Sequence, residues 1–394
     1  RLWYPRPGQG GDIPSRAEHG MSQEQFDQAI PEEFWREVVD RVQTEVPDSL
    51  LLAEAFWMME GFFVRNLGMH RVYNSAFMNM LKMEDNEKYR RTMQNTLEYD
   101  PQILKRFVNF MNNPDEDTAV AQFGKDDKYF GVCTLMVTMP GLPMFGHGQI
   151  EGFAEKYGME YRRAYWEEGE DTNLIERHQR EIFPLIHRRH VFANVERFRL
   201  FDLYDANGTI NQNVFAYSNA SGHERALVLY NNSYYEANGW IQMSTGNAAL
   251  DSDGNKNLRH DRLAAALSLT QDYSHYVILQ EQRSGLWFIR NSGELYDQGM
   301  FVHLRGYESQ IFLNIYEVAD TDHHYYARLS DHLAGAGTPD MDVALKRLTL
   351  QPLHDAFSLV ANSGVLRRLG EYFTAIAKHR DTEKPTAVES SVNA

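Results

Sequence analysis

The chain has 394 residues, of which 43% are hydrophobic, and a formal net charge of −16. This length and apolar content are enough to bury large cores, and they favour two or three domains over one. The acidic balance disfavours nucleic acid and anionic membranes as partners and favours a neutral or cationic small partner. The oligomeric state stays open.

The single cysteine, Cys133, lies in the apolar run 132–137. A lone cysteine cannot form an internal disulfide, so we expect a buried thiol in a reducing compartment, the cytoplasm. No run of about 18 uncharged apolar residues is present, so the sequence predicts no transmembrane helix. The chain starts at Arg1 with RLWYPRPGQGG, which indicates entry in the middle of a domain, and residues 1–30 are expected to form a long irregular loop.

Helices and short apolar strands alternate over residues 1–198. An amphipathic helix is predicted from Pro31 to residue 46. The apolar run 49–57 follows and predicts a strand buried on both faces. Further strands are expected at 71–77, 106–111 and 142–147, with helices at 85–97 and 126–139 between them. Four strands joined by helical crossovers predict a parallel sheet or a (β/α) barrel.

From residue 199 the pattern changes to alternating apolar and polar residues separated by turn sequences. Strands are predicted at 213–217, 225–230, 276–280, 286–290 and 310–316, so residues 199–330 are expected to form an antiparallel β domain. The Gly- and Pro-containing segment 335–339 ends this pattern. Residues 331–394 are predicted to be a helical segment with a polar tail from about residue 381.

Acidic and amide side chains follow three of the predicted parallel strands. Glu54 ends an otherwise apolar strand, where a carboxyl costs several kcal/mol to bury unless it is compensated. In a barrel this end of a strand carries catalytic groups, and such a carboxyl can have the raised pKa of a proton donor. A structural ion pair is the alternative for Glu54. The segment FVNFMNNPDE at 107–116 could equally be an ordinary turn and helix cap.

The third segment, PGLPMFGHGQIEG at 140–152, puts glycines and His147 directly after a strand. Glycines let the backbone approach a ligand closely. His147 either reaches the mouth of the site or is a packed histidine. Trp57 is either a platform that stacks on a sugar ring or a core residue. The other histidines are scattered, so no transition-metal site is predicted.

Together LLLAEAFW, FVNFMNNPDE and PGLPMFGHGQIEG resemble the fifth-, seventh- and eighth-strand motifs of the α-amylase family of glycoside hydrolases and transglycosylases. The resemblance covers roughly residues 1–200 and implies the second half of a (β/α)8 TIM barrel, strands five to eight, and the β domain that follows it in that family. It implies that Glu54 is the general acid/base and that Asp115 binds sugar hydroxyls and stabilises the transition state. A calcium ion is common in the family.

The resemblance extends to the sixth-strand segment VYNSAF at 72–77. It implies substrate contacts for Tyr73, Asn74, Asn113, Trp57 and His147. The sequence departs from the family in two respects. Pro114 stands where most members have a histidine. In addition, no strand ending in Arg-x-Asp, the family's nucleophile motif, precedes the helix at 31. We therefore expect strands one to four upstream of Arg1, and no activity from this chain in isolation.

The implied function is that of a retaining α-glycosidase or transglycosylase acting on an α-linked glucan or maltooligosaccharide. Whether it hydrolyses or transfers stays open, because that depends on whether water or a sugar reaches the intermediate. An alternative is a non-catalytic carbohydrate-binding or scaffold protein with barrel geometry. Another (β/α) barrel enzyme, such as an aldolase or isomerase, would require a catalytic lysine or a metal cluster at the strand ends.

Overall fold

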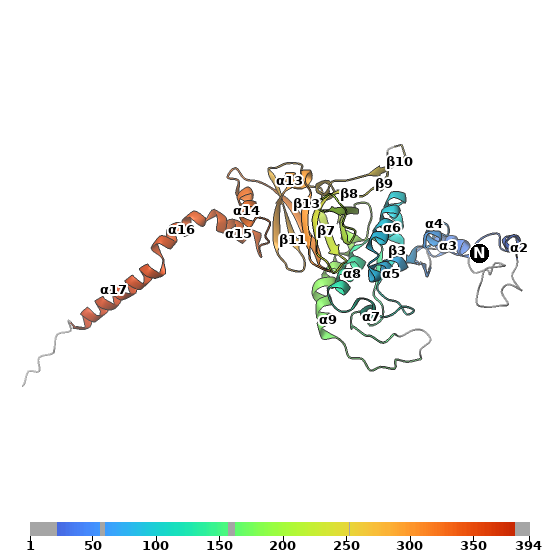
Figure 1. Cartoon of the computed structure of the whole chain (residues 1–394), viewed down its shortest axis with the longest axis horizontal. Coiled ribbons are helices and arrows are strands. Elements are labelled where there is room, and N and C mark those ends of the chain that lie inside the picture. Colours follow the sequence, from blue (N-terminus) through green and yellow to red (C-terminus); the bar gives the residue numbers. More distant parts are fainter. Residues whose placement is uncertain (1–21, 56–59, 157–161, 252, 383–394) are drawn as a thin grey trace, which may run out of the picture. The chain divides into compact units, whose positions relative to one another are not determined.

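The computed structural model describes residues 22–55, 60–156, 162–251 and 253–382 and divides the chain into two compact units (Figure 1). The first unit extends to Ala319 and the second begins at Asp320. The domain boundary predicted after residue 198 falls inside the first unit, directly before a strand. The boundary predicted after residue 330 falls within helix α14 (Tyr325–Leu333).

A four-stranded parallel sheet lies in the N-terminal part of the first unit, as the sequence predicted. Its strands are β1 (Leu52–Ala53), β2 (Arg71–Tyr73), β3 (Phe107–Phe110) and β4 (Leu142–Met144). They follow one another in the sheet in chain order. The register pairs Ala53 with Val72, Val72 with Phe107, and Phe110 with Met144. Since all four strands are parallel, their carboxyl ends lie at one edge.

Helices precede, connect and follow these strands. They are α2 (Gln23–Ala29), α3 (Phe34–Glu45), α4 (Glu60–Arg65), α5 (Ser75–Met83), α6 (Asn86–Tyr99), the 3₁₀ helix η1 (Pro101–Arg106), α7 (Ala119–Phe123), α8 (Asp127–Thr138), α9 (Thr172–Arg177), the π-helical turn η2 (His178–Ile182), α10 (Phe183–His187) and α11 (Arg189–Phe192). The helices predicted at 85–97 and 126–139 correspond to α6 and α8.

Three predicted elements differ from the structure. Residues 22–30 are not loop throughout, because Ser22 and Gln25 cap each other and start α2: Ser22 Oγ accepts from the Gln25 amide at 3.2 Å, and Gln25 Oε1 accepts from the Ser22 amide at 3.0 Å. The strand predicted at 49–57 is not buried on both faces, since Leu52 is 41% exposed. The strand predicted to reach Phe77 stops at Tyr73, because Asn74 caps α5 there.

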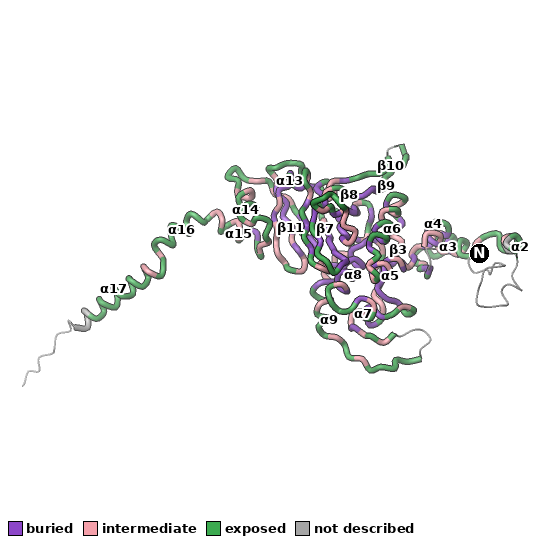
Figure 2. The backbone as a smooth tube through the Cα atoms, viewed as in Figure 1, coloured by how far each residue is buried: buried purple, intermediate pink, exposed green. Residues whose placement is uncertain are grey.

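Helix α8 forms the centre of the first unit. Every residue from Tyr129 to Thr138 is buried, as expected of a helix that is apolar on all sides (Figure 2). Gly131 permits this packing, because a Cβ there would lie 1.9 Å from the ring of Tyr230. The same core includes side chains from α5, α6, β3 and the antiparallel sheet. The parallel and antiparallel sheets therefore share one core around α8.

Residues 199–319 form the antiparallel sheet that the sequence predicted. Its eight strands, in sheet order, are β12 (Trp287–Asn291), β11 (His275–Glu281), β14 (Ser309–Ala319), β7 (Glu224–Asn231), β6 (Val214–Ser221), β5 (Arg199–Tyr204), β8 (Ala237–Ser244) and β13 (Met300–Leu304). A separate hairpin pairs β9 (Asn247–Leu250) with β10 (Lys256–Arg259). Two short helices, α12 (Leu263–Ala266) and α13 (Ser292–Asp297), pack on a second core formed by this sheet.

The second unit is helical, as predicted from residue 331. It contains α14, α15 (Met341–Thr349), α16 (Gln351–Val360) and α17 (Ser363–Thr382). Large apolar side chains on α16 and α17 are exposed, including Phe357 and Phe373. No helix among the described residues is both long and apolar enough to span a membrane.

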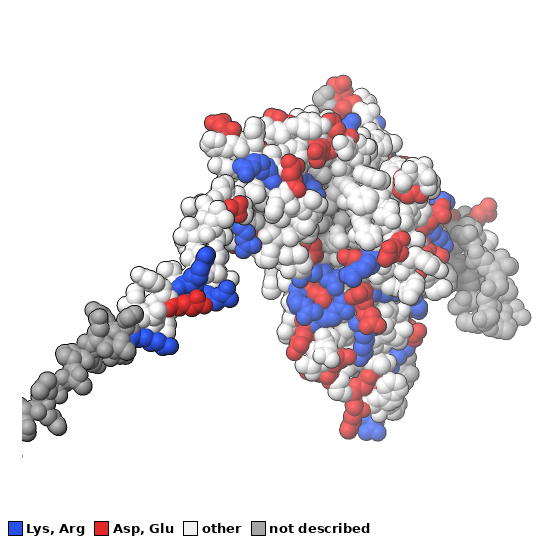
Figure 3. Space-filling view, turned by 60° about the vertical axis from the view of Figure 1, so that its left-hand side comes forward, with Lys and Arg blue, Asp and Glu red and all other residues white. Residues whose placement is uncertain are grey.

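The surface carries charges of both signs. On the face shown in Figure 3, Lys and Arg side chains lie next to Asp and Glu side chains. The phosphates of nucleic acids bind to continuous basic surfaces, and the mixed charges of this face are not of that kind.

Candidate active site

The predicted site residues follow the carboxyl ends of the four parallel strands. Glu54 comes directly after β1, and Tyr73 is the last residue of β2. Asp115 lies in a turn five residues after the end of β3, and His147 lies in a turn three residues after the end of β4. Parallel strands bring their carboxyl ends to one edge of the sheet, which is the edge where barrel enzymes hold their catalytic groups.

Glu54 and Asp115 interact with each other. The pKa of Glu54 is raised, first because neighbouring atoms remove part of the hydration of its carboxyl, and then because Asp115 is negatively charged and hydrogen-bonded to it. Both residues are exposed at the sheet edge. A carboxyl with a raised pKa holds its proton closer to neutral pH, which is what a general acid requires.

Tyr73 joins this pair. Burial raises the pKa of its hydroxyl, and the negative charges of Glu54 and Asp115 raise it further. Its ring packs on Phe110 of β3, with the ring centroids 5.2 Å apart. Tyr73 therefore remains a neutral hydroxyl beside the two carboxyls and can donate a hydrogen bond there.

Asn113 shapes the turn that carries Asp115. Its Oδ1 accepts hydrogen bonds from the backbone amides of Asp115 at 3.0 Å and Glu116 at 2.9 Å. The carbonyl of Asp115 accepts a hydrogen bond from Lys156 Nζ at 2.6 Å. The backbone of Asp115 is thus held through both its amide and its carbonyl. The Nδ2 of Asn113 is buried and has no hydrogen-bond partner among the described residues.

Asn74 is engaged within the protein. Its Oδ1 accepts from the amide of Phe77 at 3.2 Å, which caps α5, and its Nδ2 donates to Asn109 Oδ1 at 2.9 Å. The side chain is 5% exposed. In this structure Asn74 ends β2 and starts α5.

His147 is exposed on the loop after β4, and its ring lies 6.0 Å from that of Phe153. Gly146, the residue before it, approaches Asn112 so closely that a Cβ would lie 2.3 Å from Asn112 Oδ1. The loop after β4 therefore packs directly on the end of β3. Trp57, predicted to stack on a sugar ring, lies outside the described residues.

Asn112 was not singled out by the sequence analysis. It is 4% exposed, and its Oδ1 has no hydrogen-bond partner among the described residues. Buried polar atoms nearly always have partners, so an exception needs an explanation, such as strain, a bound water or a functional role. The sequence signal that could have identified it is the pair of consecutive amides, Asn112 and Asn113, shortly after an apolar strand.

A cavity of about 1150 Å³ begins beside this site, where Asn74 and Glu116 line it. It continues along α5 and α6, where the lining includes Asn79, Asn95 and Tyr99. Two cations lie over the ring of Tyr99, with the Arg65 guanidinium carbon 5.1 Å and the Lys256 ammonium 4.9 Å from its centroid. The amide groups in this lining can form hydrogen bonds with neutral hydroxylated ligands.

The described residues contain no group of three His, Cys, Asp or Glu side chains that could hold a metal ion.

Comparisons with known proteins give similarities in fold only. No family model matches the sequence, and no curated protein matches it. Among solved structures, the chain is similar to an Anoxybacillus α-amylase, with 14% identity, a TM-score of 0.48, and coverage of 71% of this chain and 55% of the amylase.

Two further solved structures show the same level of similarity. A Geobacillus thermoleovorans α-amylase complexed with acarbose has 13% identity and a TM-score of 0.48, over 72% of this chain and 57% of its own. A Nostoc punctiforme debranching enzyme has 15% identity and a TM-score of 0.48, over 72% of this chain and 56% of its own. The chain therefore spans little more than half the length of these proteins.

Proposed function

We propose that this chain belongs to a retaining α-glycosidase or transglycosylase of the α-amylase type, acting on α-linked glucan or maltooligosaccharide. The observation that carries the proposal is the pair Glu54 and Asp115 at the carboxyl edge of the parallel sheet, within motifs that resemble those of the family. The order of the four parallel strands supports the assignment of β1 to β4 as strands five to eight of a barrel.

In the proposed reaction Glu54 acts first as a general acid. It donates its proton to the glycosidic oxygen while the bond from that oxygen to C1 breaks, so the leaving sugar departs as an alcohol. An aspartate attacks C1 and forms a glycosyl ester. Water or a sugar hydroxyl then attacks C1, Glu54 takes its proton, and the ester bond breaks to restore the aspartate.

Asp115 and Tyr73 have supporting roles in this proposal. Asp115 accepts hydrogen bonds from sugar hydroxyls, which strengthen as the ring distorts towards the transition state. Tyr73, whose pKa is raised, donates a hydrogen bond beside the two carboxyls. Asn113 supports Asp115 in this role, because its Oδ1 accepts hydrogen bonds from the backbone amides of Asp115 and Glu116.

The large cavity next to the site fits an extended neutral chain. Its volume of about 1150 Å³ exceeds the common range of about 300 to 1000 Å³ for small-molecule sites, so it can receive several sugar units. The amide side chains of Asn79 and Asn95 in its lining can form hydrogen bonds with sugar hydroxyls. We propose that sugar units beyond the reacting bond occupy this cavity.

The buried, free thiol of Cys133 supports a cytoplasmic location for the protein.

The resemblance assigns the nucleophile to an aspartate on a strand before β1. Among the described residues before β1, 22–51, there is no strand. We therefore propose that the reaction needs residues beyond this sequence. The test compares this chain with one extended by the sequence encoded upstream of Arg1, using maltoheptaose hydrolysis or transfer as the readout. Only the extended protein is expected to react, and turnover by the present chain would overturn this assignment.

The role of Glu54 has its own test in the extended protein. Glu54→Gln is expected to lower turnover of maltoheptaose by about 10²- to 10⁴-fold, the usual contribution of a general acid. It is expected to slow the first-turnover release of fluoride from an α-maltosyl fluoride much less, because fluoride leaves without a proton. Glu87→Gln, on the exposed surface of α6, is the matched control. If Glu54→Gln leaves maltoheptaose turnover unchanged, or if the extended protein binds maltoheptaose without any turnover, a carbohydrate-binding protein becomes the better account.

A further inference from the structure

A buried pair of ring side chains lies beneath the loop that carries His147. Tyr129 of α8 and His178 of η2 are both fully buried. The Tyr129 hydroxyl lies 2.7 Å from the backbone carbonyl oxygen of Gln149 and 2.9 Å from Nε2 of His178. Gln149 is two residues after His147, so this contact reaches the loop itself.

The hydrogen-bond partners assign the protons. The hydroxyl of Tyr129 has one hydrogen, and the carbonyl of Gln149 can only accept, so Tyr129 donates to Gln149. The ring Nε2 of His178 must then donate to the oxygen of Tyr129, and Nδ1 carries no hydrogen. Nδ1 is buried and has no partner among the described residues. Burial also lowers the pKa of His178 to about 4, so the ring is neutral near pH 7.

His178 touches the loop at a second point. Its ring packs on Phe145, with 6.3 Å between ring centroids. Phe145 precedes the loop turn and Gln149 lies within it, so the two contacts flank His147. The loop needs such support, because Gly146 and Gly148 give its backbone wide conformational freedom, and Gly148 adopts a φ of 68°. Within the loop, the amides of Gly152 and Phe153 bond to the carbonyl of Gly148 at 2.8 and 2.9 Å.

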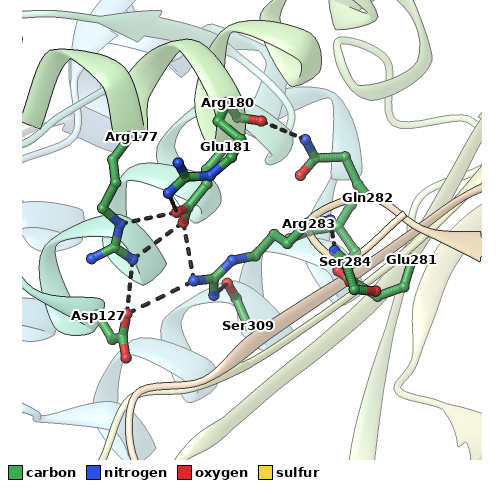
Figure 4. Close-up of polar contacts among 10 residues, drawn as sticks. Asp127, Arg177, Arg180, Glu181, Glu281, Gln282, Arg283, Ser284 and Ser309 are labelled. Atoms are coloured by element: carbon green, nitrogen blue, oxygen red, sulfur yellow. Dashed lines mark hydrogen bonds and ion pairs between the residues drawn. The ribbon is translucent and has the colours of Figure 1, made fainter. Parts of the chain in front are cut away.

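The π-helical turn that presents His178 is itself held by the antiparallel sheet (Figure 4). The Glu181 carboxylate, 6% exposed, forms ion pairs with Arg177 at 2.9 Å and Arg180 at 3.1 Å. It also pairs at 3.1 Å with Arg283, from the turn between β11 and β12. Gln282, in the same turn, donates to the carbonyl of Arg180 at 2.9 Å. A π-turn inside a helix often occurs at a functional site.

We propose that Tyr129 and His178 are positioning residues that fix the loop carrying His147 at the carboxyl edge of the parallel sheet. The ion pairs of Glu181 extend this support to the β11–β12 turn, so the antiparallel sheet contributes to the geometry of the site. Only the role of His147 in sugar binding rests on the proposed function. The tether, by which we mean the hydrogen bonds that join His178 to Tyr129 and Tyr129 to the carbonyl of Gln149, is a property of the described residues.

Amide hydrogen exchange of the full chain, without sugar, tests the tether. Tyr129→Phe is expected to accelerate exchange of the protected amides of Gly152 and Phe153 by roughly tenfold, because the loop opens locally once the hydroxyl is lost. Tyr217→Phe is the matched control: its hydroxyl is equally buried and bonds to Thr138 of the same helix α8, away from the loop. Unchanged exchange in Tyr129→Phe, or equal acceleration in both variants, would overturn the proposal.

A second pair of variants covers the case in which Tyr129→Phe does not fold. Glutamine can place an N–H where Nε2 of histidine lies, whereas leucine cannot. His178→Gln is therefore expected to keep exchange of the loop amides close to that of the wild type, and His178→Leu to accelerate it by roughly tenfold. If the two variants behave alike, the hydrogen bond to Tyr129 does not hold the loop.

Sugar binding is measured separately, by titrating the full chain with maltoheptaose and following the imidazole signals of His147 by NMR. If the wild type binds, Tyr129→Phe is expected to weaken binding and Tyr217→Phe is not. Equal affinity in wild type and Tyr129→Phe would remove the link between the tether and the site. If the wild type shows no binding, the proposed function loses support, whereas the exchange result still decides the tether.

Discussion

The carboxyls of Glu54 and Asp115 interact across β2, although these residues follow β1 and β3, which are not neighbours in the sheet. Tyr73 lies at the end of the intervening strand, and the negative charges of both carboxyls raise the pKa of its hydroxyl. The site is therefore assembled from three consecutive parallel strands. No two of these three residues are close in the sequence.

Replacing Asp115 by asparagine is expected to lower the pKa of Glu54 towards its ordinary value. The substitution removes the negative charge that favours the protonated form of Glu54, while burial continues to raise the pKa. The measurement is an NMR titration of the Glu54 side-chain carboxyl carbon. Asp117→Asn, two residues along the same exposed segment, is the control and should leave the titration unchanged. An unaltered pKa of Glu54 in Asp115→Asn would show that the carboxyls do not interact.

Alanine at Gly146 is expected to disturb the packing between the loop after β4 and the end of β3. Its Cβ would lie 2.3 Å from Asn112 Oδ1, so the loop or the buried amide has to move. Overpacking of this kind costs about 1 to 3 kcal/mol in the free energy of unfolding. Gly169→Ala is the control, since a Cβ there meets no atom within 4 Å. Urea unfolding curves compare the two, and equal midpoints would contradict the close approach.

Arg90 is expected to be the most sensitive charged residue of α6. It is fully buried and pairs with the carboxylate of Asp202. Its Nη1 also donates a hydrogen bond to the carbonyl oxygen of Val214 at 2.5 Å. Arg90→Met leaves these groups without their partner, and breaking a buried pair typically costs about 3 to 5 kcal/mol. Arg91→Met is the control, because Arg91 is 67% exposed and exposed ion pairs contribute roughly 0 to 1 kcal/mol. Chemical denaturation should separate the two variants clearly; similar losses of stability would argue against the buried pair.

His178 is expected to make the protein less stable in mild acid. Its folded-state pKa of about 4 lies below the value of about 6.5 for an unfolded chain, so between these values the unfolded state binds more protons. Stability therefore rises with pH across this window and is lost as pH falls from about 6.5 to about 4. The full effect is on the order of 3 kcal/mol.

Urea unfolding of the His178→Gln variant at several pH values between 4 and 7 measures this contribution. The variant should show a smaller loss of stability in acid than the wild type. Tyr217→Phe, which alters an equally buried ring but removes no histidine, should retain the pH dependence of the wild type. A wild-type pH dependence in His178→Gln would show that His178 does not titrate as its burial implies.

The local pattern of the sequence was enough to predict most elements that have a strong period or cap. Apolar spacing predicted the positions of helices α6 and α8 and of strands β3, β6, β7, β11 and β12. Each of these elements is regular and buried on one side or all round, so its apolar residues follow the period of the element. Strands β5, β8 and β13 were not predicted. In β8, Gly239 interrupts the apolar alternation, and a Cβ there would lie 2.1 Å from the carbonyl of Tyr204, so this glycine is required by the neighbouring strand.

The sequence by itself determined that acidic and amide side chains follow parallel strands, since the alternation of helix and strand and the position of Glu54 and Asp115 are local features. Only the tertiary structure decided that these two carboxyls interact, that Asn74 bonds to Asn109, and that the buried Oδ1 of Asn112 has no partner among the described residues. The contacts from Tyr129 to Gln149 and from Arg283 to Glu181 join residues 20 and about 100 positions apart. Such contacts depend on packing between elements, which no local period of the sequence encodes.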